Sequence, residues 1–134
     1  MGKTLAEIAL NKGERVVATS RTLPSLSSFP SLEPPSSPPE PTPASRLLTL
    51  QLDVTNPTSI SHAFSEAKRA FGRIDVVVSN AGFALFGEVE GTPDGTARAM
   101  FETNFWGAAN VAREAVRSWD WLRGAGNGTL SLRT

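Results

Sequence analysis

The stretch IDVVVSNAG at residues 74–82 decides the fold of this 134-residue chain. Its three consecutive valines predict a strand that is fully buried, as the strands of parallel sheets are. The tripeptide Asn80-Ala81-Gly82 follows at once and is therefore expected at the carboxyl end of that strand. Open α/β sheets bind their ligands beyond this end of the strands, so functional residues are expected nearby.

Two more strands are expected before this stretch. The apolar runs at 15–20 and 47–52 suit strands of such a sheet, and the second run ends at Asp53. A short helix at residues 3–12 precedes them. Gly13 comes next, and glycine is the residue that most easily ends a helix in a left-handed conformation.

Two longer helices complete the pattern. From Ile60 to Phe71 apolar residues recur at three- and four-residue steps, which predicts one apolar face. Thr55 or Asn56 is expected to cap this helix, with Pro57 in its first turn. A second helix is expected from Thr96 to Leu122, with most of its apolar residues on one side.

This alternation predicts an α/β fold with a Rossmann-like, doubly wound parallel sheet. Residues 129–132 would begin a further strand. The pattern starts on a helix rather than on a strand.

Residues 22–46 differ in kind from the rest of the chain. They hold eight of the ten prolines and almost no periodic apolar pattern, which predicts a disordered insertion within the domain. Residues 35–38 have the P-x-x-P spacing of an SH3 ligand, but no basic residue lies close enough to orient one. A solvated loop is the simpler interpretation.

Composition excludes several classes of site. Lysine plus arginine equals aspartate plus glutamate at 13 each, which leaves no overall field for holding a nucleic acid. There is no cysteine and a single histidine, His62, so disulfides and Cys/His metal clusters are ruled out. No apolar run approaches the roughly 20 residues of a membrane span. We expect a soluble, cytoplasmic protein that binds no metal, nucleic acid or membrane, with His62 on a solvated helix face.

Three pieces of sequence together resemble the short-chain dehydrogenase/reductase family. They are Leu52-Asp53-Val54-Thr55, then Asn80-Ala81-Gly82 after an apolar strand, then Asn104 within FETNFWGA at 101–108. A lone Asn-Ala-Gly tripeptide is weak evidence, but the order and the intervals of this set match the family. The resemblance extends over residues 2–129, excepting the proline-rich insertion. It implies that residues 1–134 are one partial nucleotide-binding domain, whose sheet is incomplete, without its first strand and its carboxyl-terminal half.

The resemblance implies that Asp53 hydrogen-bonds the adenine amino group of a bound dinucleotide, and that the Val54 backbone lies against the ring. It also implies that Asn80, Ala81 and Gly82 support the sheet and pass close to the cofactor ribose. Gly82 suits that use because a residue without a side chain permits close approach. The alternatives are that Asp53 ends a strand and caps a turn, and that residues 80–82 are a simple turn.

Arg21 follows the run at 15–20, about 20 residues beyond Gly2, where this fold class contacts the adenosine ribose. A guanidinium matches a phosphate by its charge and its fork of donors, so NADP(H) is favoured over NAD(H). The alternative is a solvated arginine. Gly2 is interpreted as the last glycine of the family's phosphate turn. A weaker alternative takes Gly2-Lys3-Thr4 as the end of a P-loop, which lacks its preceding glycine and strand.

Asn104 resembles the family's helix asparagine, which holds a water in the proton relay, and it is the candidate catalytic residue. On physical grounds alone, an asparagine in an apolar helix face bonds backbone or water. The family's tyrosine, lysine and serine lie beyond Thr134 in the family's order. The chain contains no tyrosine at all.

The sequence therefore predicts part of an NADP(H)-dependent enzyme that oxidises an alcohol or reduces a carbonyl, truncated at both ends and inactive by itself. Its expected partners are the nucleotide cofactor and a small alcohol or carbonyl substrate. A homo-oligomer is an option for a full-length form. The alternative is a nonenzymatic nucleotide-binding or protein-interaction remnant.

Overall fold

The computed structural model of the protein describes residues 1–22 and 46–119. Four separate elements are followed by one long helical run. The four are α1 (Gly2–Asn11), β1 (Val16–Ser20), β2 (Leu47–Gln51) and α3 (Pro57–Phe71), and the run consists of α4 (Asp94–Phe101), the π-helical turn η2 (Glu102–Gly107) and α5 (Ala108–Ser118). Nearly all of the insertion predicted at 22–46 and the strand predicted at 129–132 lie outside the described residues.

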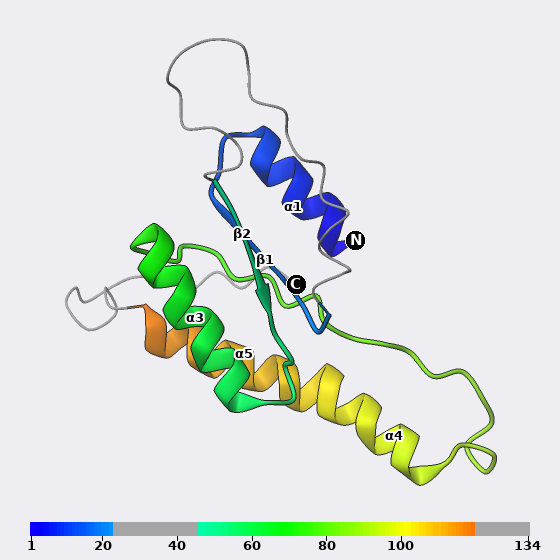
Figure 1. The fold of residues 1–134 in the computed structure, drawn as a ribbon. Helices are drawn as coiled ribbons and strands as arrows, with labels where there is room; N and C mark the ends of the chain where they lie inside the picture. The colour runs from blue at the N-terminus through cyan, green and yellow to red at the C-terminus, as the bar shows by residue number, and fades with distance from the viewer. Residues whose placement is uncertain (23–45, 120–134) are drawn as a thin grey trace, which may run out of the picture.

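β1 and β2 form a parallel pair, as the sequence predicts. Their register runs from Val16 opposite Leu47 to Ser20 opposite Gln51, and the Leu52 amide extends the ladder by donating to the Ser20 carbonyl at 2.9 Å. α1 lies on one side of this pair, and α3 and α5 lie together on the other (Figure 1). The described residues thus form a Rossmann-like α/β fold that is incomplete, as expected.

Local signals fix the two ends of α3. Asn56 rather than Thr55 caps the helix, because its side-chain oxygen accepts from the amides of Thr58 at 3.0 Å and Ser59 at 3.3 Å. Pro57 occupies the first turn, where its missing amide costs nothing. Gly72 ends the helix with a φ of 81°, a left-handed conformation that glycine adopts without strain.

One apolar cluster joins the inner faces of α3 and α5 to the end of β2. Its buried members, here called the core cluster, are Val54, Ile60, Phe64, Val111, Ala115 and Trp119. Leu52, Ile74 and Val77 pack against it and are partly buried. The apolar spacing predicted for α3 is therefore confirmed for its central residues, whereas Ala70 near the helix end is exposed.

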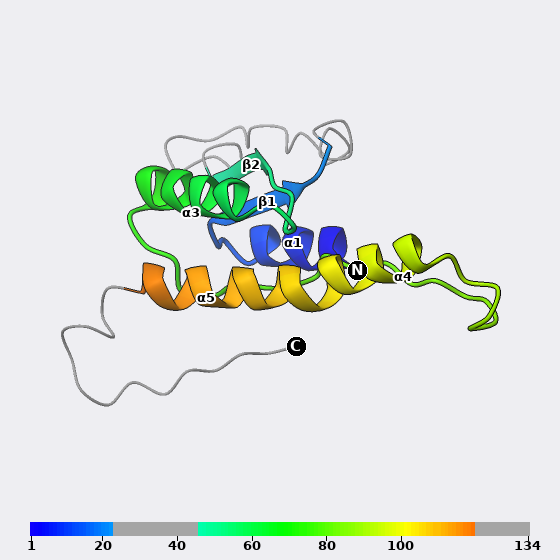
Figure 2. The same ribbon diagram turned by 90° about the horizontal axis from the view of Figure 1, so that it is seen from below.

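The prediction of a fully buried strand over residues 74–79 is wrong. The segment has no strand pairing, and the side chains of Val76 and Val78 are 76% and 49% exposed. The physical reason is that β1 is paired only with β2 among the described residues, so no neighbouring strand covers the valine run. The chain nevertheless passes from α3 to the end of α5 (Figure 2). There the Trp119 Nε1 donates to the Ile74 carbonyl at 2.8 Å, which fixes the start of the segment.

The helix predicted over 96–122 begins two residues earlier, at Asp94, and continues through η2 to Ser118. Its inner positions are buried as expected, but Phe101 and Phe105 are 60% and 57% exposed, so the apolar side is only partly covered. Within the two described ranges, no helix combines the length and the apolar character that crossing a membrane requires.

Candidate cofactor site

Arg21 and Asp53 are brought together because they follow paired strands. Ser20 and Gln51 are register partners, and the Gln51 Nε2 donates to the Arg21 carbonyl at 2.9 Å. The Asp53 amide donates to the Ser59 Oγ at 3.1 Å, which ties the end of β2 to the first turn of α3. Both residues therefore lie at the carboxyl edge of the sheet, as predicted.

The Asp53 carboxylate is held by its own turn. Its Oδ1 accepts from the Thr55 Oγ1 at 2.7 Å and from the Thr55 amide at 2.9 Å. These two bonds, the side-chain bond first, lower the pKa of Asp53. Burial opposes them by a smaller amount, and the positive charge of Arg21 adds the smallest effect, again a lowering of the pKa. Asp53 therefore caps a turn. Among the described residues both of these bonds go to Oδ1, so Oδ2 can accept a hydrogen bond from another group.

Gly2 and Asn80 meet at the start of α1. A Cβ atom on Gly2 would lie 2.7 Å from the Asn80 Nδ2, well inside any normal contact, so the absence of a side chain is what permits this approach. The carboxyl end of the 74–79 segment is thereby fixed beside the helix N-terminus. Helix N-termini present free amides and a partial positive charge, which suits a phosphate.

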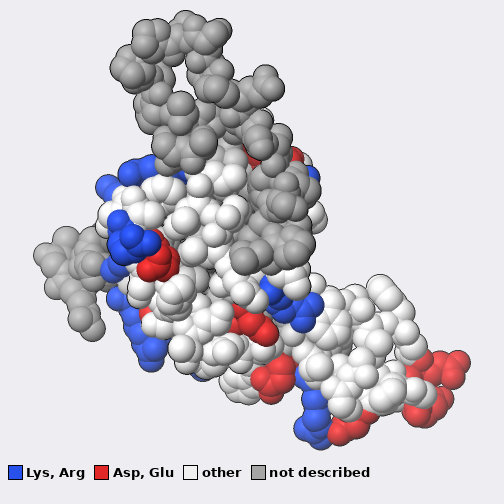
Figure 3. Space-filling view, in the orientation of Figure 1, with Lys and Arg blue, Asp and Glu red and all other residues white. Residues whose placement is uncertain are grey.

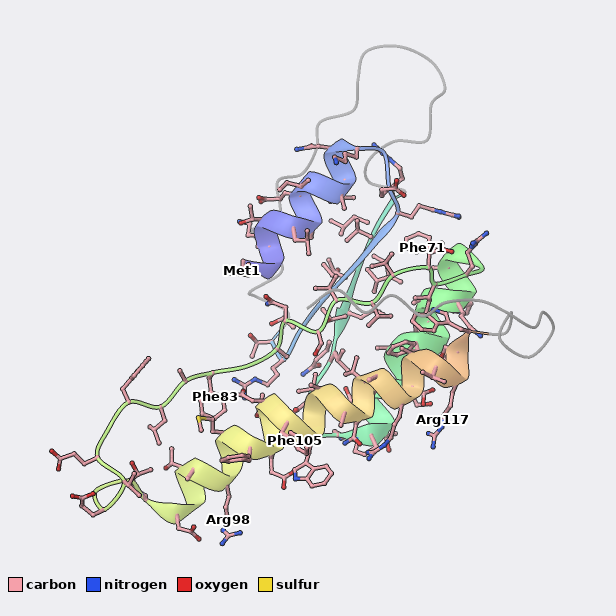
Figure 4. The ribbon with its side chains drawn as sticks, turned by 180° about the vertical axis from the view of Figure 1, so that it is seen from behind. Met1, Phe71, Phe83, Arg98, Phe105 and Arg117 are labelled. Carbon is pink, nitrogen blue, oxygen red and sulfur yellow. The ribbon has the colours of Figure 1, made fainter. Side chains whose placement is uncertain are left out.

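Asn104 lies in η2 and binds the backbone just after Gly82. Its Oδ1 accepts from the Phe83 amide at 3.0 Å, and its Nδ2 donates to the Phe83 carbonyl at 2.8 Å. A Cβ on Gly82 would lie 3.0 Å from the same Oδ1. Figure 4 shows the segment carrying Phe83 against the helix that carries Phe105. Asn104 thus bonds backbone, and π-helical turns of this kind often occur at functional sites.

The predicted site residues fall into two groups, and the π-helical turn η2 contacts both. Arg21, Asp53 and Val54 follow β1 and β2, whereas Gly2, Asn80, Ala81, Gly82 and Asn104 surround the end of the 74–79 segment. η2 connects them, because Asn104 binds Phe83 while Gly107 contacts the buried Val54. The sequence did not predict the contacts of Thr55 with Asp53 and of Gly107 with Val54. A glycine followed directly by Ala108 and Ala109 inside a helix was the available signal for Gly107.

Other kinds of site find no support in the described ranges. These residues contain no group of three or more histidine, cysteine, aspartate or glutamate side chains placed to hold a metal. His62 is exposed on α3, as predicted. Lysine, arginine and acidic side chains are interspersed over the face in Figure 3, with no continuous field of either sign. Any phosphate is therefore expected to bind through local groups.

Comparisons with known proteins agree with this geometry. A curated oxidoreductase of Schizosaccharomyces pombe, uncharacterised in function, is 34% identical over 133 residues, 99% of this chain and 40% of that protein. Oxidoreductase calM of Penicillium decumbens is 37% identical over 120 residues, 87% of this chain and 36% of that protein. The chain thus spans about two fifths of the length of these relatives.

Solved structures show the same fold. A short-chain dehydrogenase from Streptomyces avermitilis gives a TM-score of 0.72 at 28% identity, covering 93% of this chain and 42% of the other. An ElxO variant with NADPH bound gives 0.75 at 26% identity, covering 90% and 46%. The sequence pattern of the family described as short chain dehydrogenase matches residues 1–129. The chain therefore belongs to the short-chain dehydrogenase family of NAD(P)-binding oxidoreductases.

Proposed function

We propose that residues 1–134 form a partial dinucleotide-binding domain of an NADP(H)-dependent enzyme that oxidises a small alcohol or reduces a carbonyl compound in the cytoplasm. The observation that carries this proposal is the pair Arg21 and Asp53 at the ends of β1 and β2. A guanidinium suits the 2′-phosphate of NADP(H), and a carboxylate suits the adenine amino group.

The described residues fit such a nucleotide in three respects. Asp53 keeps Oδ2 for a donor while Thr55 holds Oδ1. Gly2 lets Asn80, at the end of the 74–79 segment, lie against the N-terminus of α1, whose free amides suit a phosphate. Arg21 is exposed and already close enough to lower the pKa of Asp53 by its charge. The ElxO variant with NADPH bound, at 26% identity, supports the choice of cofactor.

The side chains present in this chain determine which part of the reaction its residues would perform. Bound nicotinamide would supply hydride transfer, and the residues of this chain would bind and orient the nucleotide. A part in the family's proton relay stays a prediction for Asn104, whose side-chain amide is engaged by Phe83. With no tyrosine in the sequence, no phenol is present to exchange a proton with the substrate.

The purified 134-residue chain is accordingly expected to show no dehydrogenase or reductase turnover. The assay follows NADPH or NADP⁺ absorbance against a panel of alcohols and carbonyl compounds. A longer version that adds a Gly-rich turn before Met1 and a tyrosine-lysine segment after Thr134 serves as the positive control. Turnover that remains with the 134-residue chain through several columns, and disappears in its Arg21→Asp variant, would refute the proposed inactivity.

A further inference from the structure

Gly107 lies inside a continuous helical run, where alanine would stabilise the helix more than glycine does. Its φ of −59° and ψ of −49° are ordinary right-handed helical values, so the backbone does not require glycine. Glycine is also the less favourable of the two residues in the interior of a helix. The next two residues, Ala108 and Ala109, are alanines in the same helical run. A reason other than backbone conformation must therefore explain Gly107.

The reason is the closeness of Val54. A Cβ on Gly107 would lie 2.6 Å from the Val54 Cγ2, 3.1 Å from the Val54 Cβ and 3.2 Å from the Glu102 carbonyl oxygen. Ordinary carbon contacts are about 3.5 to 4.0 Å. Val54 is buried in the core cluster, and a β-branched side chain has little freedom to turn away. Any side chain at position 107 must displace Val54 or the helix.

Displacing Val54 would disturb the turn that presents the Asp53 carboxylate. Val54 lies between Asp53 and Thr55, and the bonds from Thr55 to the Asp53 Oδ1 span it. The Asp53 amide is fixed on the other side by the Ser59 Oγ at 3.1 Å. With one end of the turn tied to α3, a push on Val54 is expected to act on the carboxylate and on its bonds to Thr55.

We propose that Gly107 is a positioning residue of the adenine site. Its missing side chain lets η2 and Val54 pack together, and this contact sets the orientation of the Asp53 carboxylate. Gly107 touches neither cofactor nor substrate and acts through Val54. The inference rests on the proposed function, because it takes Asp53 as the group that recognises adenine.

Three variants separate this role from a general loss of stability. Gly107→Ala introduces the clash. Gly95→Ala is the matched control, because Gly95 lies in α4 and an added Cβ there meets nothing within 4 Å. Adding Val54→Ala to Gly107→Ala removes the Cγ2 atom from the shortest contact. The contacts to the Val54 Cβ at 3.1 Å and to the Glu102 carbonyl oxygen at 3.2 Å remain, and a small shift relieves them. The double variant is therefore expected to recover the original turn.

The first measurement needs no nucleotide. NMR titration of the Asp53 carboxyl carbon should show its pKa raised in Gly107→Ala, because the bonds from Thr55 that lower it are weakened. Gly95→Ala should leave the pKa of Asp53 unchanged, and the double variant should return it toward the original value. A loss of global stability alone does not change this local pKa in the folded state. An unchanged pKa in Gly107→Ala overturns the inference.

The second measurement compares NADPH with its analogue that carries hypoxanthine, which lacks the adenine amino group. The original chain should prefer NADPH, and Gly107→Ala should weaken NADPH binding about tenfold and reduce the preference. Asp53→Asn should abolish the preference. If Asp53→Asn abolishes it and Gly107→Ala keeps it, the positioning role is overturned alone. If Asp53→Asn keeps it, the adenine assignment of the proposed function fails, and the adenine part of the inference fails with it.

Discussion

Replacing Arg21 by aspartate is expected to lower the affinity for NADPH by about ten- to a hundredfold or more while affinity for NADH is unchanged or higher. Charge-assisted hydrogen bonds contribute roughly 1.5 to 3 kcal/mol each, and about 1.4 kcal/mol corresponds to a factor of ten. The variant replaces a fork of donors with a carboxylate that repels the 2′-phosphate. NADH has no such phosphate, so it loses nothing at this position.

Calorimetric titration with both nucleotides measures this effect, best in the longer version of the chain described above. Arg113→Asp is the matched control, because it makes the same change in net charge at an exposed position on α5. That control should leave both affinities within about twofold, since Arg113 is not among the residues at the ends of β1 and β2 and salt screens an exposed charge. Equal weakening of NADPH and NADH by Arg21→Asp would mean that Arg21 does not bind the 2′-phosphate.

Replacing Trp119 by alanine is expected to remove about 3 to 5 kcal/mol from the free energy of unfolding. Trp119 is 8% exposed, belongs to the core cluster and donates from Nε1 to the Ile74 carbonyl at 2.8 Å. The change would therefore leave a cavity under α5 and release the start of the 74–79 segment. Whole domains are stable by only about 5 to 15 kcal/mol, so this variant should be close to unfolding.

Urea denaturation followed by circular dichroism gives the comparison. Trp106→Ala is the control, because Trp106 is 46% exposed and contacts the Phe105 ring edge-on at a centroid distance of 4.9 Å. Its loss should cost about 1 kcal/mol or less. If the two tryptophan variants lose equal stability, Trp119 does not anchor the 74–79 segment in the way described here.

Local signals in the sequence were sufficient for the elements whose ends depend on neighbouring residues. Asn56, Pro57 and Gly72 define α3 because a cap, a first-turn proline and a left-handed glycine act within one turn of the helix. The parallel direction of β1 and β2 also followed from the alternation of apolar runs, since crossover rules leave few topologies for a parallel sheet, whereas their pairing and register came from the structure.

Contacts between distant residues were not predictable in this way. The run Val76-Val77-Val78 has the composition of a buried strand, but burial requires a neighbouring strand, and β1 pairs only with β2 in the described residues. The contact between Gly107 and Val54 joins residues 53 positions apart, and nothing in a pattern of periodicity specifies it. The site residues were found through the resemblance, whereas their mutual packing required the structure.

The central claim is that the ends of β1 and β2 recognise the adenosine half of NADP(H). The most direct test is an NMR titration of the 134-residue chain with adenosine 2′,5′-bisphosphate, which carries the 2′-phosphate, and with adenosine 5′-monophosphate, which does not. We predict saturable shifts of the Arg21, Asp53, Val54 and Thr55 amides, at lower concentrations of the bisphosphate than of the monophosphate. Shifts confined to other residues, or equal affinity for the two nucleotides, would contradict the account.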